Sequence, residues 1–387
     1  VELLYLSHCV PYPPNKGEKI RAFYEIEALA SRHRVHLACF ARTPSEMEDA
    51  KHLLGNPCAS VYAAPLFPFP LHAARALARF CAGGCLNSSF YSSRALRRDV
   101  AALHAQVKLD AAVAYTAVMA PFVPNDLPFV LDYIDVDSEK WLAYAKRRQP
   151  SLFYRLEAGR VRRLEIAQGR RARLGLFTTQ AEESVFRSFA ADIPTAYLEN
   201  GVESRYFDPA AVKPDPALAG RDYLLFVGSM DYYPNTEAAE RFARDIFPAL
   251  RAAAPGLELL IVGRKPTQSV FALGRVDGVE VVGTVEDVRP YYLGCRAVVA
   301  PLSIARGIQN KVLEALAMER PVLASRAICR TFGQTLPKGV YECESVEDYA
   351  RPVETGRIRK HAMARFSWTS NLGVLIRAVD QLRRPSR

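Results

Sequence analysis

The chain has 387 residues, of which 50% are hydrophobic and 24% charged, and its formal net charge is +10 at pH 7. This length exceeds what one hydrophobic core usually supports and fits two α/β domains of about 200 residues each. The longest stretch without acidic or basic residues, 52–74, contains four prolines, which excludes a membrane-spanning helix there. Residues 1–7 read as a strand rather than a secretory signal. Eight scattered cysteines without C-x-x-C spacing predict reduced thiols, so we expect a cytoplasmic protein.

The first half opens with an apolar strand at 2–7, the loop HCVPYPPNKGEKIR at 8–21 and a helix at 17–31. A strand, a glycine-containing loop and a helix start together favour phosphate binding. We therefore take Gly17, Lys19 and Arg21 as candidate binding residues, with a purely structural turn as the alternative. The G-x-G-x-x-G dinucleotide fingerprint is absent from this loop.

Further apolar strands are expected at 35–41, 59–64, 111–115, 128–134, 174–178 and 196–199, with helical segments between them. This alternation predicts a parallel, doubly wound sheet. The sequence DVDSEKW follows the strand at 128–134, at the edge where such sheets bind ligands. Asp135 is the candidate site residue there, and helix capping by Asp137 or Ser138 is the alternative.

The segment 140–173 carries eleven basic residues against two acidic ones, which accounts for most of the net charge. It reads as helical, with apolar residues interleaved. We expect peripheral contact between 140–173 and an anionic membrane, with a solvated basic face as the alternative. The charge is accompanied by no nucleic-acid-binding signature, so we expect no nucleic-acid partner.

A Pro/Ala-rich stretch at 208–221 predicts a linker. The second half repeats the α/β pattern, with strands expected at 223–227, 257–262, 279–282 and 297–300. Gly228 and Ser229 directly follow the first of these strands. Arg264 comes after Gly263 at the end of the second strand, and Thr284 and Val285 come after Gly283 at the end of the third. Parallel strands bring such residues to one edge of the sheet.

The stretch PLSIARGIQNKVLEALAMERPVLAS at 301–325 reads as a strand end, a glycine-containing loop, a helix at about 308–319 and a further strand. A helix N-terminus carries roughly half a positive charge and is a natural phosphate site. Glu314 lies one turn after Lys311 on the same side, where a carboxylate can accept hydrogen bonds from ribose hydroxyls. An ordinary helix with a solvated Lys311–Glu314 pair is the alternative. The predicted nucleotide-diphosphate site comprises Arg306, Gly307, Ile308, Gln309, Asn310, Lys311 and Glu314.

The run KVLEALAMERPVLAS resembles the donor-binding segment of glycosyltransferase family 4, whose members are nucleotide-sugar enzymes with the GT-B fold. YLENGVESRYFDP resembles the family's junction signature, in which Asn200 and Gly201 form a turn. PYPPNKGEKIR, DVDSEKW, GSMDYYPN and ARGIQNKVLEA look like the branch of sugar transferases associated with PEP-CTERM/exosortase exopolysaccharide systems. The chain departs from the family in two places, because Arg306 replaces a first glutamate and GSMDYYPN lacks the usual Arg and Lys.

The resemblance implies two Rossmann-like domains facing a cleft, 1–207 for the acceptor and 222–365 for the nucleotide-sugar, joined by the linker 208–221. A final helix at 366–387 would pack on the first domain. The implied reaction is retaining transfer from an NDP-sugar to a hydroxyl of a lipid-linked or growing exopolysaccharide glycan, without a metal or other cofactor.

The resemblance also assigns roles to the candidate residues. It implies diphosphate binding by Arg306 and Lys311, ribose binding by Glu314, and sugar or acceptor contact by Asp135. It implies close backbone approach at Gly17 and Gly228, nucleobase contact at Thr284 and Val285, and a substitute cation at Arg264. A GT-B epimerase and a catalytically silent sugar-nucleotide-binding or lipid-binding subunit are the alternatives.

Overall fold

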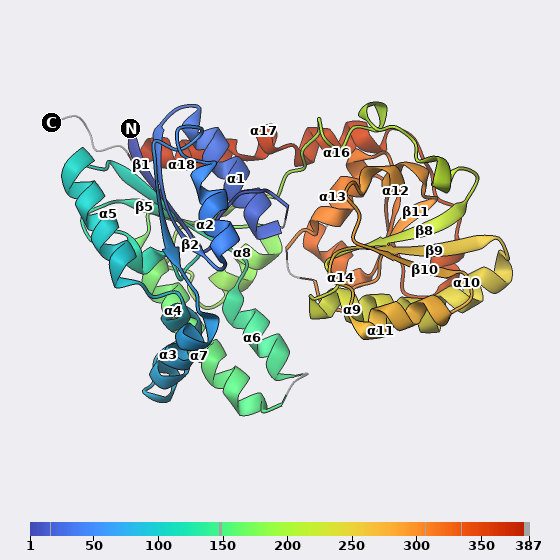
Figure 1. The fold of residues 1–387 in the computed structure, drawn as a ribbon, viewed down its shortest axis with the longest axis horizontal. Coiled ribbons are helices and arrows are strands. Elements are labelled where there is room, and N and C mark those ends of the chain that lie inside the picture. The colour runs from blue at the N-terminus through green and yellow to red at the C-terminus, as the bar shows by residue number, and fades with distance from the viewer. Residues whose placement is uncertain (16, 147–148, 306, 334, 383–387) are drawn as a thin grey trace. The chain divides into compact units, whose positions relative to one another are not determined.

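The computed structural model describes residues 1–15, 17–146, 149–305, 307–333 and 335–382. It divides the chain into two units, Val1–Leu198 together with the C-terminal segment from Leu372, and Glu199–Asn371. Each unit contains one parallel β-sheet with helices packed on it (Figure 1). The prediction of two doubly wound α/β domains is confirmed.

The first sheet has seven strands in the order β3-β2-β1-β4-β5-β6-β7. Its strands are β1 (Glu2–Ser7), β2 (Arg34–Ala41), β3 (Ser60–Pro65), β4 (Ala111–Tyr115), β5 (Phe129–Ile134), β6 (Leu174–Phe177) and β7 (Thr195–Tyr197). The helices of this unit are α1 (Gly17–Ala30), α2 (Pro44–Lys51), α3 (Phe69–Cys81), α4 (Leu86–Phe90), α5 (Arg94–Val107), α6 (Asp137–Ala145), α7 (Ser151–Arg171), α8 (Gln180–Arg187) and α18 (Gly373–Gln381). The strand order reverses between β1 and β4, which is where doubly wound sheets bind ligands.

The second sheet has six strands in the order β10-β9-β8-β11-β12-β13. Its strands are β8 (Asp222–Val227), β9 (Leu257–Val262), β10 (Val279–Gly283), β11 (Ala297–Ala300), β12 (Val322–Ala324) and β13 (Val340–Glu342). The helices are α9 (Tyr233–Arg241), α10 (Phe247–Ala253), α11 (Gln268–Phe271), α12 (Arg289–Gly294), α13 (Asn310–Ala317), α14 (Arg326–Cys329), α15 (Val346–Ala350), α16 (Ile358–Phe366) and α17 (Trp368–Asn371). Helices α9 and α11 lie along one face of the sheet and α12 and α13 along the other (Figure 1). The order reverses between β8 and β11.

The central strands are apolar and almost fully buried, as a sheet covered on both faces requires. Every residue of β4 and β11 is buried. Side-chain caps begin several of the surrounding helices. Thr43 accepts from the backbone N–H of Glu46 at the start of α2, and Thr179 accepts from Glu182 at the start of α8.

The observed boundary between the units differs from the predicted end at residue 207. The chain from Glu199 belongs to the second unit because its backbone is bonded there: Val202 N donates to Phe366 O at 2.8 Å. Arg359 also donates to Ser204 O at 2.6 Å. The predicted linker 208–221 contributes to the core of the same unit, in which Val212 and Leu218 are buried.

The described part of the predicted final helix, up to residue 382, contains two short helices, α17 and α18, rather than one helix. Helix α17 belongs to the second unit, where Asn371 donates its side-chain amide to Glu199 O at 3.0 Å. Helix α18 belongs to the first unit, where it contacts α1, β4 and β5. Asp380 of α18 lies 3.5 Å from the imidazole of His33. Among the described residues, no helix has both the length and the apolar character needed to cross a bilayer.

Candidate functional site

Glycines bring three loops into contact at the carboxyl edge of the second sheet. Gly228 follows β8, Gly263 follows β9, and Gly283 ends β10. Gly228 N donates to Val262 O at 3.1 Å, and Gly263 N donates to Gly283 O at 2.7 Å. A Cβ on Gly263 would lie 1.6 Å from Gly228 O, so only glycine fits there. Glycine therefore allows these loops to pack directly on one another at this edge.

Helix α13 begins beside these loops, on the other side of the strand reversal. Gly307 has φ +64°, and Gln309 is the N-cap residue, whose side chain makes no capping hydrogen bond. The helix starts at Asn310 and ends at Ala317, shorter than the predicted 308–319. Its N-terminus presents backbone N–H groups and the positive end of the helix dipole. Arg306 lies outside the described residues.

Lys311 is buried within the second unit, so the alternative of a solvated pair with Glu314 is wrong. Its side chain Nζ donates to Asn235 Oδ1 at 2.7 Å and lies 4.9 Å from the ring centroid of Phe226. Asn235 in turn donates to Ser229 O at 3.0 Å. Burial lowers the pKa of Lys311 to about 7, against the opposing effect of Glu314. Lys311 therefore titrates near neutral pH.

Glu314 lies one turn further along α13 and is half-buried. Tyr292 donates its hydroxyl to Glu314 Oε2 at 2.8 Å. Burial raises the pKa of this carboxyl, while Tyr292 and Lys311 oppose the shift. In the described part of the chain Tyr292 alone donates to this carboxylate, and it does so at Oε2, so Oε1 can accept a ligand hydroxyl.

The other candidates of the second unit have distinct surroundings. Asn200 reaches the start of α13, with its amide 3.5 Å from both Ile308 O and Asn310 Oδ1. Gly201 packs against Trp368, whose backbone N would lie 2.6 Å from a Cβ added to Gly201. The glycine is therefore needed here for packing within the second unit.

The loops after β8, β9 and β10 hold the remaining candidates of this unit. Ser229 donates its hydroxyl to Asp231 Oδ1 at 2.7 Å. The backbone of Arg264 accepts from Met230 N at 2.8 Å, which ties the first two loops together. Thr284 is exposed directly after Gly283, and Val285 is half-buried.

In the first unit the structure places Lys19 and Arg21 in internal ion pairs. Lys19 Nζ lies 2.9 Å from Glu46 Oε1. Arg21, 1% exposed, lies 2.7 Å from Asp132 Oδ2 and 3.0 Å from Glu25 Oε1. Both side chains are buried with carboxylate partners and stabilise the fold, so we withdraw their assignment to phosphate binding.

Gly17 and Asp135 lie at the carboxyl edge of the first sheet. Gly17 is the exposed first residue of α1. Asp135 follows β5 and accepts from the Thr178 hydroxyl at 2.7 Å. Burial and the nearby Glu182 raise the pKa of Asp135 to about 7. The capping alternative concerned Asp137 and Ser138, but the N-cap residue of α6 is Val136.

A polar cluster around His8, which the sequence reasoning did not select, lies at the strand reversal of the first sheet. His8 directly follows β1; its Nε2 lies 3.3 Å from Glu18 Oε2 and its Nδ1 lies 3.4 Å from Tyr115 O. Arg42 donates to Glu18 Oε1 at 2.8 Å and to the Tyr91 hydroxyl at 3.2 Å. The signal available in the sequence was a histidine immediately after the first strand.

The same cluster includes Cys9, and its donor set does not suit a metal. Among the described residues, His8, Cys9 and Glu18 are the group whose ligand atoms lie close enough to hold an ion. However, burial and the neighbouring Glu18 raise the pKa of the Cys9 thiol to about 12, and Arg42 is bonded to Glu18. A thiol that stays protonated and a carboxylate already paired with a guanidinium are poor metal ligands.

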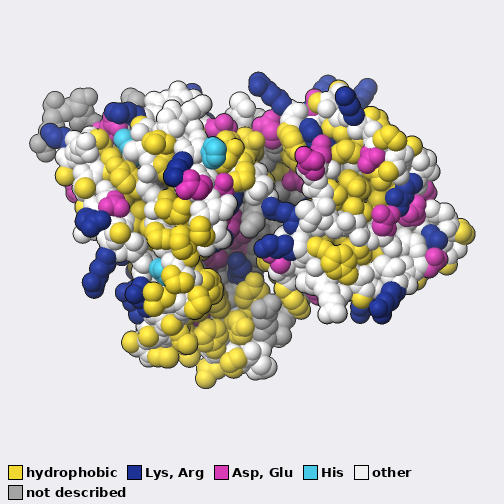
Figure 2. All heavy atoms as spheres, viewed as in Figure 1, with side chains coloured by type: hydrophobic (Ala, Val, Ile, Leu, Met, Phe, Trp, Pro, Cys, Tyr) yellow, Lys and Arg dark blue, Asp and Glu magenta, His cyan; other side chains and the backbone are white. Residues whose placement is uncertain are grey.

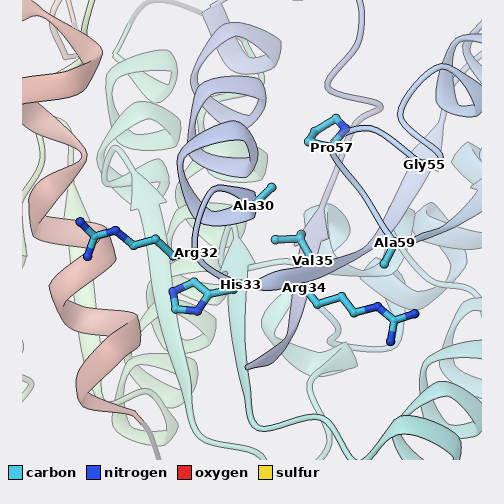
Figure 3. Close-up of a pocket in the computed structure, with 8 residues that line it drawn as sticks. All are labelled: Ala30, Arg32, His33, Arg34, Val35, Gly55, Pro57 and Ala59. Atoms are coloured by element: carbon cyan, nitrogen blue, oxygen red, sulfur yellow. The ribbon is translucent and has the colours of Figure 1, made fainter.

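A separate open pocket of about 430 Å³ lies at the opposite edge of the first sheet. Its lining residues lie near the beginnings of β2 and β3. They include Arg32 and Arg34, whose side chains extend in opposite directions (Figure 3). Ligands of doubly wound sheets bind at the carboxyl ends of the strands. This pocket is therefore not the candidate site.

Several arginines of the basic segment 140–173 are bonded within the first unit. Arg160 donates to Phe80 O at 2.8 Å and Gly84 O at 2.9 Å. Arg171 donates to Ala120 O at 3.2 Å. Part of the positive charge that predicted a membrane contact therefore stabilises the fold.

Two doubly wound units, each with a reversal of strand order in its sheet, have the architecture of the GT-B fold. Comparison with known proteins agrees with this assignment. The family model described as glycosyl transferases group 1 matches residues 221–353. The matched region lies within the second unit, which therefore resembles a group 1 glycosyltransferase domain. Among curated proteins, none matches the chain in sequence.

Solved structures similar to the chain include HepE of Anabaena in complex with UDP and glucose, at 14% identity and a TM-score of 0.65 over 98% of this chain and 99% of that one. Sucrose-phosphate synthase from Thermosynechococcus elongatus is 17% identical, with a TM-score of 0.67 over 99% of each chain. A UDP-forming trehalose-phosphate synthase from Burkholderia xenovorans is 13% identical, with a TM-score of 0.64 over 98% of this chain and 99% of that one. At these identities the similarity establishes the fold.

Proposed function

We propose that the protein transfers a sugar from an NDP-sugar to a hydroxyl of an acceptor, with retention of anomeric configuration. The observation that carries this proposal is the buried Lys311 in the first turn of α13, with Glu314 one turn later at the strand reversal of the second sheet. The helix N-terminus and the Lys311 ammonium would stabilise the charge of the departing diphosphate.

The donor would bind across the loops of the second unit. We assign the ribose to Glu314 Oε1 and the diphosphate to the N-terminus of α13 with Lys311 and Arg306. Gly228 and Gly307 would allow close approach of the backbone, and Thr284 and Val285 would contact the base. HepE was solved with UDP and with UDP-glucose, which makes UDP-sugars the first donors to test.

The acceptor would bind at the first unit, with Asp135, Gly17 and the His8 cluster at its sheet edge. We propose a lipid-linked or growing exopolysaccharide glycan, as in the PEP-CTERM/exosortase-associated branch that the sequence resembles. A phosphate oxygen of the leaving group would take the acceptor proton, and neither a metal nor another cofactor would take part.

The test is a thermal-shift screen of UDP-, GDP- and ADP-sugars, followed by turnover assays with lipid-linked acceptors. A donor that stabilises the protein and is consumed only when acceptor is added supports the proposal. Conversion of the sugar without acceptor would instead indicate an epimerase. Binding without turnover across the acceptors would indicate a catalytically silent subunit.

A further inference from the structure

Helix α9 begins with two exposed tyrosines where polar capping residues are favoured. Tyr232 is the N-cap residue, and within the described part of the chain its side chain makes no capping hydrogen bond. Thr43 and Thr179 make such bonds at the starts of α2 and α8. Tyr232 is 46% exposed and Tyr233 is 43% exposed. Neither helix capping nor burial therefore explains the two aromatic rings at this position.

The backbone that carries Tyr232 and Tyr233 is held in place by hydrogen bonds. Hydrophobic side chains are exposed at several places among the charged residues of the second unit (Figure 2), so exposure alone does not mark a site. Asn235 N donates to Tyr232 O at 2.9 Å. Thr236 donates its hydroxyl to Met230 O at 2.7 Å. A turn fixed in this way loses little conformational entropy when a ligand binds to it.

The same turn contacts the buried lysine of the proposed diphosphate site. Gly228 begins the turn at the carboxyl end of β8. Asn235, near the other end of the turn, accepts from Lys311 Nζ at 2.7 Å. Tyr232 and Tyr233 lie between these two residues in the chain. The tyrosines therefore belong to a loop that borders the proposed diphosphate site.

Asp231 is the one charged residue of the sequence GSMDYYPN at 228–235. Ser229 donates its hydroxyl to Asp231 Oδ1 at 2.7 Å, which lowers the pKa of this carboxyl, and Lys265 Nζ lies 3.4 Å from Oδ2. An ionised carboxylate can accept further hydrogen bonds from hydroxyl groups, whereas it repels a phosphate. Two aromatic rings next to one carboxylate therefore suit a neutral ligand that is rich in hydroxyl groups.

We propose that Asp231, Tyr232 and Tyr233 form the subsite for the sugar ring of the donor. A pyranose presents C–H bonds on its two faces and hydroxyl groups around its rim. The tyrosine rings stack on a face of the sugar, and Asp231 accepts from a hydroxyl. The inference rests on the proposed function and deepens it, because the residues assigned above in the second unit contact the nucleotide and leave the sugar without a partner.

The test is calorimetric titration of the full chain with three matched pairs: UDP and UDP-glucose, GDP and GDP-mannose, and ADP and ADP-glucose. We expect Tyr232→Ala/Tyr233→Ala to weaken binding of the sugar nucleotide by about tenfold and to change binding of its diphosphate by less than about threefold. Asp231→Asn should have the same selective effect. Tyr232→Phe/Tyr233→Phe keeps both rings and should retain the affinity within about threefold. Phe271→Ala is the matched control, because Phe271 is an aromatic residue of the same unit that is 57% exposed outside this turn.

Thermal melts of each variant establish that the substituted residues, all exposed, leave the fold intact. The inference is overturned if the double alanine variant binds the sugar nucleotide as tightly as wild type, or if it loses affinity for sugar nucleotide and diphosphate by the same factor. It is also overturned if Phe271→Ala has an equal effect, or if the double alanine variant raises only the KM for the acceptor. A wild-type protein that binds none of these nucleotides would overturn the proposed function and this inference with it, so binding by wild type distinguishes the two failures.

Discussion

The ammonium of Lys311 lies 2.7 Å from Oδ1 of Asn235, linking the first turn of α13 to α9 across the strand reversal of the second sheet. Both side chains are buried. Burying a lysine ammonium costs free energy that burying an apolar side chain would not. The presence of Lys311 at this position therefore points to a role in binding a negatively charged ligand.

Replacing Lys311 by Met should weaken binding of the nucleoside diphosphate and stabilise the unliganded protein. Loss of a charge-assisted hydrogen bond costs about 1.5–3 kcal/mol of binding free energy. Removing a buried ammonium should add about 1–3 kcal/mol to the free energy of unfolding at pH 7. Calorimetric titration and denaturant melts measure the two effects. Lys265→Met is the control, since Lys265 is exposed; equal affinities for wild type and Lys311→Met would remove Lys311 from the site.

The affinity for the diphosphate should fall as the pH rises above about 7. Burial lowers the pKa of Lys311 to about 7 in the free protein, and a bound diphosphate raises it, so binding takes up a proton. The decrease should reach at most about tenfold per pH unit between pH 7 and 9. Titrations in buffers of different ionisation enthalpy measure the proton uptake. A Lys311→Met variant should show a flat profile over this range, and a flat wild-type profile would contradict the assignment.

The unliganded protein should become more stable over the same range. The pKa of Lys311 lies below its unfolded value of 10.5, so between about pH 7 and 10.5 the unfolded chain holds the additional proton. The penalty for burying the ammonium is complete below pH 7 and declines as the pH rises. The stability gain of Lys311→Met should therefore shrink toward pH 10, which urea denaturation at several pH values can follow.

Replacing Glu314 by Gln should reduce discrimination between a ribose and a deoxyribose diphosphate. A carboxylate that accepts from a ribose hydroxyl contributes about tenfold to a hundredfold in affinity, and the neutral amide contributes less. The measurement compares UDP with 2′-deoxy-UDP for both proteins. If wild type already binds the two equally, Glu314 does not contact the 2′-hydroxyl.

Replacing Arg21 by Met should destabilise the first unit by about 3–5 kcal/mol, because Asp132 and Glu25 would be left buried without their cation. Burial and Asp132 already raise the pKa of Glu25 well above its usual value. Denaturant melts measure the loss, and calorimetry should show unchanged diphosphate affinity under conditions where the variant is folded. A specific loss of affinity without loss of stability would restore the phosphate-binding role.

Replacing Gly263 by Ala should cost about 3 kcal/mol or more, since the new methyl group would overlap Gly228 O and separate the loops after β8 and β9. Gly274→Ala is the matched control, because a Cβ there meets no atom within 4 Å. Equal melting temperatures for the two variants would show that the glycine-rich edge adjusts freely.

The sequence predicted the two sheets well because their strands are apolar runs separated by turns, and the loop glycines mark where backbone approaches backbone. Ion pairs between residues that are far apart in the sequence could not be predicted from such patterns. Arg21 and Asp132 are 111 residues apart, and only the fold shows that one neutralises the other. The same holds for the His8 cluster: His8 contacts Glu18 and Tyr115 O, and Arg42 donates to Glu18, although these residues come from separate segments that the strand order brings together.

The division between the units was predicted less accurately, because the composition of 208–221 resembles a linker although Val212 and Leu218 are buried. Periodicity alone also predicted one final helix, where the chain instead passes from the second unit to the first between Asn371 and Leu372.

The return of the chain from the second unit to the first bears on the order in which the two units are completed during synthesis. Glu199 and Asn371 begin and end the second unit and are hydrogen-bonded to each other, so this unit is an insertion whose two ends meet. All of its residues are translated before α18. The first unit, although most of it is translated earlier, is therefore completed only after the whole second unit and α18 have been made.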